Sequence, residues 1–216
     1  MAGLMLASPL ARLHAFFEST GSERMQGLDE TYFIGMNESE KRKVWDFLKD
    51  RFDRSSDRIV GLYLLGPLQA VELFKKAVAS PIPETPYAAT RRDLEGNRIL
   101  MLRKIVEIEP LPEYLEAINE FSYSQFTGVR AAFARAVPKD KVTPNAIRGL
   151  KSMIFTDTEM LPLGTAIRKL MLLHGVHYDP DDPVYRSTLR SLMSQDVEEK
   201  RIGMQRLQAI RAPDYI

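Results

Sequence analysis

Two histidines and three aspartates lie within ten residues of one another, in the segment HGVHYDPDDP at positions 174–183. Imidazole and carboxylate groups are common zinc ligands in proteins. His174 and His177 on one face of a helix, completed by Asp179, Asp181 or Asp182, would form such a site. This segment is therefore the first place to look for chemistry in the chain.

The glycine inside this segment favours a different interpretation. The residues LLHGV have the form of a helix C-terminus, with Gly175 in the left-handed conformation and Val176 folding back against Met171. Farther on, Asp182 can cap a new helix that Pro183 opens. We therefore predict a join between two helices that holds no metal ion. His174 would lie in the last turn, and residues 177–179 would be exposed.

No other pattern in the sequence predicts a catalytic centre. The chain has no cysteine and three histidines, and it contains neither a G-x-S-x-G nucleophile motif nor a glycine-rich phosphate loop. We expect no catalytic residue and no cofactor, and we favour a protein that is not an enzyme.

The rest of the chain has the periodicity of α-helices. After Asn37 the apolar residues Val44, Trp45, Leu48 and Phe52 recur at steps of three and four, and strand-like alternation is nearly absent. Asn37 and Glu40 form a predicted capping box. Six prolines follow a capping or turn residue and predict helix starts: Pro9, Pro67, Pro86, Pro112, Pro144 and Pro183. The predicted fold class is all-α.

Four segments recur at a spacing close to 36 residues or a multiple of it. They are RIVGLY, RILMLR, RAAFAR and RIGMQR, which begin at Arg58, Arg98, Arg130 and Arg201. An aspartate lies five residues before three of these arginines, and a glutamine takes its place before Arg130. The pattern resembles HEAT repeats. An irregular helical bundle whose arginines align by chance is the alternative.

The resemblance implies a right-handed α-solenoid. Residues 37–210 would form about five antiparallel helix pairs after an N-terminal cap and loop at 1–36, which holds a capping helix at 9–19, and 211–216 would be a tail. The whole chain, 1–216, would be a single domain, and an acid near each turn would join an early arginine to the neighbouring pair. The linker at 79–97 would hold a partial helix that ends before Gly96.

The composition is that of an ordinary globular chain of 216 residues, with 44% apolar residues, 27% charged residues and a formal net charge of +1. The lack of cysteine fits a cytoplasmic protein. No apolar run is long enough to span a membrane, so we expect no membrane partner.

Charge is nevertheless unevenly distributed among the predicted helices. The second helices of the pairs, at 97–108, 124–137, 160–173 and 197–210, hold ten basic and three acidic residues. We predict that five of these cations point into a concave groove and bind a partner: Arg103, Arg135, Arg168, Lys169 and Arg206. They could equally be ordinary solvated surface, and the first arginine of each repeat would then be structural.

Two classes of function fit such a groove. The first is a protein-binding module that captures an acidic partner, and a bacterial toxin-neutralising immunity protein or an adaptor would suit this size and fold. The second is a nucleic-acid protein similar to HEAT-like DNA alkylation-repair glycosylases. Those enzymes place aromatic residues in a strongly basic cleft, whereas here the lone Trp45 is distant from the basic helices and the net charge is near zero. We therefore favour the protein partner.

Overall fold

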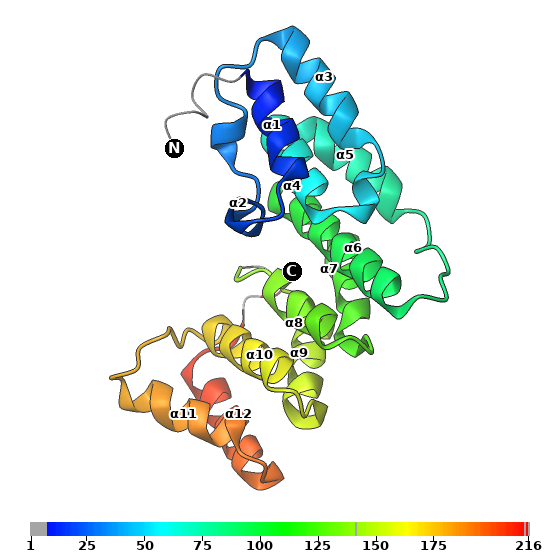
Figure 1. The fold of residues 1–216 in the computed structure, drawn as a ribbon. Coiled ribbons are helices and arrows are strands. Elements are labelled where there is room, and N and C mark those ends of the chain that lie inside the picture. The colour runs from blue at the N-terminus through cyan, green and yellow to red at the C-terminus, as the bar shows by residue number, and fades with distance from the viewer. Residues whose placement is uncertain (1–7, 141, 214, 216) are drawn as a thin grey trace. The chain divides into compact units, whose positions relative to one another are not determined.

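The computed structural model describes residues 8–140, 142–213 and 215, and its regular structure there is helical (Figure 1). The described part contains twelve α-helices and three short 3-10 helices, and its isolated β-type pairing is a parallel bridge between Val142 and Tyr215. The predicted all-α class is confirmed. None of the described helices is both long enough and apolar enough to cross a bilayer.

The chain divides into two compact units, residues 1–81 and 82–216. The first contains α1 (Pro9–Glu18), α2 (Ser22–Gln26), α3 (Glu38–Lys49), α4 (Ser56–Leu65) and α5 (Pro67–Val78). The second contains α6 (Ala88–Ile108), α7 (Pro112–Asn119), α8 (Thr127–Ala136), α9 (Pro144–Thr156), α10 (Met160–Leu173), α11 (Pro183–Met193) and α12 (Val197–Ile210). The prediction of a single domain over 1–216 stays a prediction.

Local capping explains where most helices begin. Ser8, Thr143 and Asp182 each accept a hydrogen bond from a backbone N–H in the first turn of the helix that follows, and the next residue is proline. Asn37 and Glu40 form both bonds of the predicted capping box, each 3.0 Å long. Five of the six predicted proline starts are confirmed, since α1, α5, α7, α9 and α11 begin there.

Helix α6 departs from the prediction at both Pro86 and Gly96. The helix begins at Ala88 and continues through Gly96 to Ile108 without a break. Glycine costs a helix about 1 kcal/mol relative to alanine, whereas burying one large apolar side chain contributes about 2 kcal/mol. Ile99, Leu102 and Ile105 are all buried on one side of α6, and their burial outweighs the cost of the glycine.

In the first unit, α1 packs on α3, α3 on α4 and α4 on α5. Leu13 and Phe16 of α1, with Leu48 of α3, are fully buried in this core. A Cβ atom at Gly61 of α4 would lie 3.0 Å from a methyl of Leu48, so a glycine there lets α3 and α4 approach closely.

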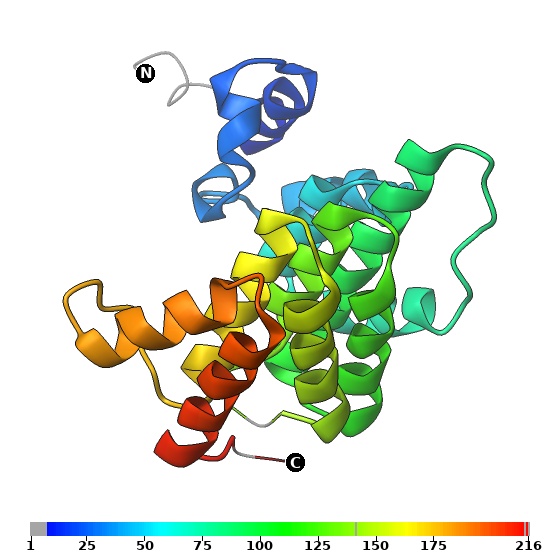
Figure 2. The same ribbon diagram turned by 90° about the horizontal axis from the view of Figure 1, so that it is seen from below.

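In the second unit, alternate helices form two layers. One contains α6, α8 and α10, each packed against the next, and the other contains α7 and α9 (Figure 2). The final pair is arranged differently, because α11 packs against α10 while α12 packs against α9. We predicted that the helix at 197–210 lies beside the helix at 160–173. In the structure α11 packs against α10 instead, and α12 packs against α9.

Candidate protein-binding face

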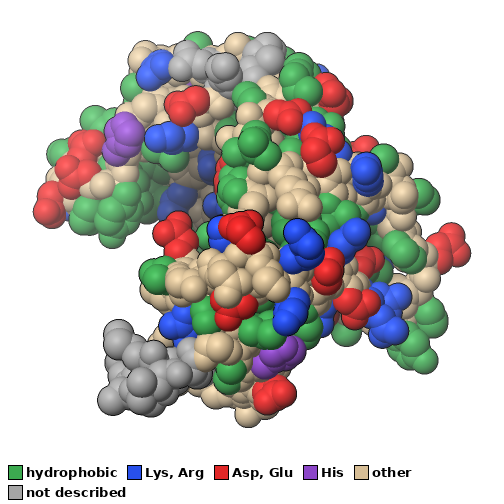
Figure 3. All heavy atoms as spheres, turned by 90° about the horizontal axis from the view of Figure 1, so that it is seen from above, with side chains coloured by type: hydrophobic (Ala, Val, Ile, Leu, Met, Phe, Trp, Pro, Cys, Tyr) green, Lys and Arg blue, Asp and Glu red, His purple; other side chains and the backbone are tan. Residues whose placement is uncertain are grey.

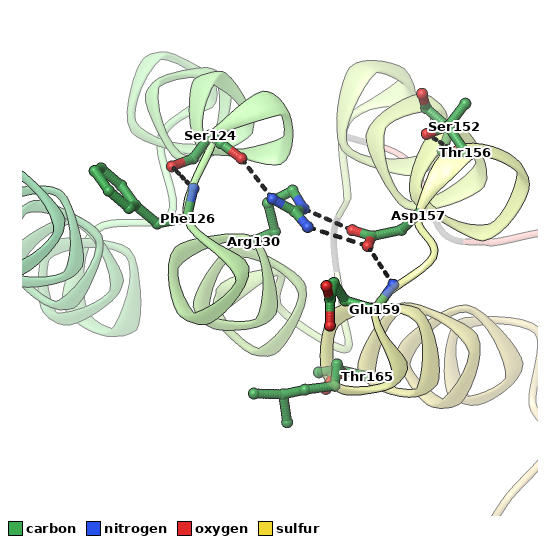
Figure 4. A network of polar contacts seen from close by, with 9 residues as sticks. Ser124, Phe126, Arg130, Ser152, Thr156, Asp157, Glu159 and Thr165 are labelled. Atoms are coloured by element: carbon green, nitrogen blue, oxygen red, sulfur yellow. Dashed lines mark hydrogen bonds and ion pairs between the residues drawn. The ribbon is translucent and has the colours of Figure 1, made fainter. Parts of the chain in front are cut away.

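Arg130 joins α8 to the next helix pair through a buried carboxylate (Figure 4). Its Nε and Nη2 donate to the two carboxylate oxygens of Asp157 at 2.6 and 3.1 Å, and its Nη1 donates to the carbonyl of Ser124 at 2.8 Å. The side chains of Arg130 and Asp157 are 17% and 4% exposed. The hydrogen bonds to Asp157 raise the pKa of Arg130 above its usual value. We call this contact the Arg130 joint.

A polar cavity of about 280 Å³ lies beside the Arg130 joint. Hydroxyl-bearing side chains line it, including Ser152, Thr156 and Thr158. Arg130 and Asp157 neutralise each other there, so the cavity offers an anionic ligand no excess of positive charge.

The predicted repeat arginines do not share one role. Arg58 in the first unit donates to the carbonyls of Phe47 and Asp50, both at 2.5 Å, near the end of α3. Arg201 is exposed and pairs with Glu198 of its own helix. Beside it, Lys200 is buried, and its Nζ donates to the carbonyl of Ile154 in α9 at 2.6 Å.

The helix starts show that Lys200, not Arg201, is the counterpart of Arg130. Arg130 is the fourth residue of α8, and Lys200 is the fourth residue of α12. Asp196 caps α12 by accepting from the backbone N–H of Glu198, so this cap was the available signal for the correct register. Asp157 was missed because the prediction looked for an acid before Arg130 in the chain.

Two of the predicted binding residues occupy matching positions on α8 and α10, which pack against each other. Arg135 lies eight residues after the start of α8 and Arg168 eight residues after the start of α10, and both are exposed. Arg103 of α6 is also exposed, and its Nε donates to Glu107 at 3.0 Å. We call these three residues the arginine row. Neither α8 nor α10 contains an aspartate or glutamate, so the row has a local excess of positive charge.

Lys169 lies next to this row and closes the C-terminal end of α8. Its Nζ donates to the carbonyls of Arg135 and Val137 at 3.3 and 2.5 Å. Burial, together with the positive charge of Arg103, lowers the pKa of Lys169 to about 8. The structure therefore brings together four of the five predicted binding residues.

Arg206 is the fifth, and it is not brought to the arginine row. It is exposed on α12, and its Nη1 donates to the hydroxyl of Ser191 in α11 at 3.2 Å. Because α12 packs against α9 and α11, Arg206 belongs to the surface of the final pair.

The histidine and aspartate segment joins α10 to α11, as predicted. Gly175 has φ +79°, and the backbone N–H of Val176 donates to the carbonyl of Met171 at 2.9 Å. His177, Tyr178 and Asp179 are exposed. In the described ranges, no three His, Asp or Glu side chains lie close enough together to hold a metal ion.

His174 has a structural role at this join. It is buried, and its Nδ1 lies 2.5 Å from the carbonyl of Arg211, to which a neutral imidazole can donate. Burial lowers the pKa of His174, and the nearby charge of Lys151 lowers it further. The imidazole therefore ties the C-terminal segment to α10 in its neutral form.

On the face drawn in Figure 3, Lys and Arg side chains alternate with Asp and Glu, as the net charge of +1 leads one to expect.

Compared with protein-family models, with curated proteins and with solved structures, the chain has no match. Its functional assignment therefore depends on its own geometry.

Proposed function

We propose that this chain is a non-enzymatic protein-binding module with a HEAT-like helical repeat, and that it captures an acidic partner on the exposed side of α6, α8 and α10. The observation that supports this proposal most directly is the arginine row, which has Lys169 beside it and no acidic residue on α8 or α10. The row consists of Arg103, Arg135 and Arg168. A nearly neutral chain that gathers cations on one surface attracts anionic partners locally without binding anions everywhere.

Arginine suits this role chemically. Its planar guanidinium can donate two parallel hydrogen bonds to one carboxylate, and it stays charged at every physiological pH. Arg135 and Arg168 are exposed, so they can reorient to meet a partner. Arg130 cannot do so, because Asp157 already takes two of its donors.

An immunity protein that neutralises a bacterial toxin, or an adaptor, is the kind of binding module that we propose. What supports it is the chain's size and its all-helical repeat-like packing around a basic surface. Since one fold can serve many functions, the immunity-protein or adaptor role is tested directly by partner capture.

The test compares two triple variants of the full chain as baits in affinity capture from the native host, with mass spectrometry of the captured proteins. In the first variant, Arg103, Arg135 and Arg168 are replaced by Gln. In the control, the same change is made at Arg186, Arg190 and Arg201, which are also exposed cations of the second unit. We expect the wild type and the control to retain an acidic protein that the first variant loses. Equal capture by all three would contradict the proposal.

Duplex DNA is the second arm of this test. Binding through phosphates weakens steeply as salt rises, so tight, strongly salt-dependent DNA binding lost in the row variant would favour the nucleic-acid alternative. Trp45, the aromatic residue that a glycosylase-like cleft would use, is half-buried on α3 in the first unit. We expect no measurable duplex binding at physiological salt.

A further inference from the structure

The arginine row is one of three parallel rows of exposed or half-buried residues on the second unit. Positions three residues before each arginine carry Leu100, Ala132 and Thr165, and positions seven residues before carry Gly96, Gly128 and Leu161. Residues three and seven apart share one face of a helix. The exposed side of α6, α8 and α10 therefore combines a basic row with two rows of mainly small or apolar residues, which together we call the apolar row.

The two glycines in these rows mark open space above the helices. A Cβ atom at Gly96 or at Gly128 would meet no atom within 4 Å. Glycine weakens a helix relative to alanine, and the surrounding atoms leave room for a Cβ at these two positions. Their effect is to lower the surface, so that a partner's backbone can approach α6 and α8 closely.

The three helices run in the same direction, which keeps the rows in register. At the N-terminal end of α8, the Arg130 joint reaches the start of α10, and Ser124 donates to Glu95 of α6 at 2.6 Å. At the C-terminal end of α8, Lys169 of α10 binds the last carbonyls. Packed helices have axes about 8–10 Å apart, so neighbouring arginines of the row start from backbones at about that spacing.

This spacing of about 8–10 Å fits acidic side chains on a partner α-helix better than acidic side chains on a partner β-strand. Seven residues of an α-helix rise about 10 Å and return to nearly the same face. In a β-strand, residues three apart also span about 10 Å, but they point to opposite faces, so the middle arginine would be missed.

We propose that the partner element is an amphipathic α-helix with an acidic side chain at every seventh position, lying across α6, α8 and α10. This inference rests on the proposed function. The three carboxylates meet Arg135, Arg168 and Arg103, the last of which exchanges its ion pair with Glu107. The apolar flank of the partner helix packs on Leu100 and Ala132 of one row and on Leu161 of the other. A nucleic-acid backbone would use the arginines but would leave this apolar row exposed to water.

The test uses synthetic helical peptides of about 21 residues, long enough to span the three helices. One peptide carries glutamates at positions i, i+7 and i+14 beside an apolar stripe. A second has the same composition with its three glutamates on different faces. A third is a proline-free, strand-forming peptide rich in Thr and Val, with a glutamate at every third residue. We expect the first peptide to bind the full-length protein at least about tenfold more tightly than the others, measured by fluorescence anisotropy.

Matched variants locate the binding site. Ala132→Trp places a bulky side chain on the apolar row and should abolish binding of the first peptide, whereas Ser187→Trp, at an exposed site on α11, should leave it unchanged. Circular dichroism checks that both variants stay folded. Equal binding of the three peptides, tighter binding of the strand-forming peptide, or no effect of Ala132→Trp would each overturn the inference.

The outcomes also separate this inference from the proposed function. If the arginine-row variant loses the native acidic partner but the three peptides bind the wild type equally, the protein-binding function stands and the helical partner is wrong. If that variant captures the same proteins as the wild type and binds the first peptide normally, both proposals fail.

Discussion

Two cations join α8 to the next helix pair, one at each end of α8, in opposite electrostatic surroundings. At the N-terminal end, Arg130 is paired with the buried carboxylate of Asp157, and its pKa is raised. At the C-terminal end, Lys169 binds only backbone carbonyls beside Arg103, and its pKa is lowered to about 8. The N-terminal end is a neutral structural joint, whereas the C-terminal end leaves positive charge uncompensated.

The two ends of α8 differ in available charge although each carries a cation, so the number of basic residues in a helix does not by itself locate a binding surface. Arg130 opens one of the four recurring segments, yet Asp157 neutralises its charge inside the fold. Arg135 and Arg168 of the arginine row have no carboxylate on α8 or α10, so their charge remains available to a partner, whereas Arg103 is exposed but paired with Glu107. The available charge therefore lies where tertiary packing supplies no acid.

The largest effect is expected from removing the acid of the Arg130 joint. Asp157→Asn leaves a mostly buried guanidinium without its counter-charge, so the free energy of unfolding should fall by about 3 kcal/mol in urea denaturation. The exposed residue Asp181 gives the matched control, since Asp181→Asn should change stability by less than about 0.5 kcal/mol. A loss for Asp157→Asn as small as that of the control would show that the joint is not a structural contact.

The next effect concerns the opposite end of α8. The folded chain releases the Lys169 proton near pH 8, whereas the unfolded chain holds it to about 10.5, so stability should rise between these pH values as the buried charge is removed. Compared with Lys169→Met, the wild type should gain about 2 kcal/mol between pH 7 and pH 10. Parallel pH profiles of unfolding for the two proteins would mean that Lys169 is not held as a buried cation.

A smaller effect is expected at the C-terminal end of α10, where the buried side chain is the neutral imidazole of His174. Since the folded-state pKa of His174 lies below its ordinary value of 6.5, the unfolded chain takes up the proton first as the pH falls. The wild type should therefore lose stability relative to His174→Gln between pH 7 and pH 5, as followed by the melting temperature. If the variant loses stability equally, other groups govern the acid response.

The smallest effect is expected for Arg206, which the sequence grouped with the arginine row. Arg206→Gln should change the affinity for the heptad-spaced acidic peptide by less than about twofold, whereas Arg168→Gln should weaken it several-fold. The reason is that α12 packs against α9 and α11, away from the layer that holds Arg168. Equal losses for the two variants would place α12 within the binding surface.

The features that were predicted correctly depend on neighbours within a few residues. Asn37 and Glu40 cap α3 across three positions, and Gly175 ends α10 through a bond that spans five. Such contacts use backbone groups that every helix end leaves unsatisfied, so residue type and spacing suffice to predict them. The same local logic failed at Gly96, because the burial of Ile99, Leu102 and Ile105 is a tertiary effect.

Residue types and local spacing were therefore enough to predict the all-α class, most helix starts and the turn that ends α10. They also grouped Arg103, Arg135, Arg168 and Lys169 with Arg206 as candidate binding residues. Three further features depend on how the helices pack: Asp157, 27 residues away, neutralises Arg130, Lys169 is buried at the end of α8, and α12 lies against α9. These outcomes depend on which helices meet. Contacts between distant segments are selected by the packing of whole helix faces, which no local spacing encodes.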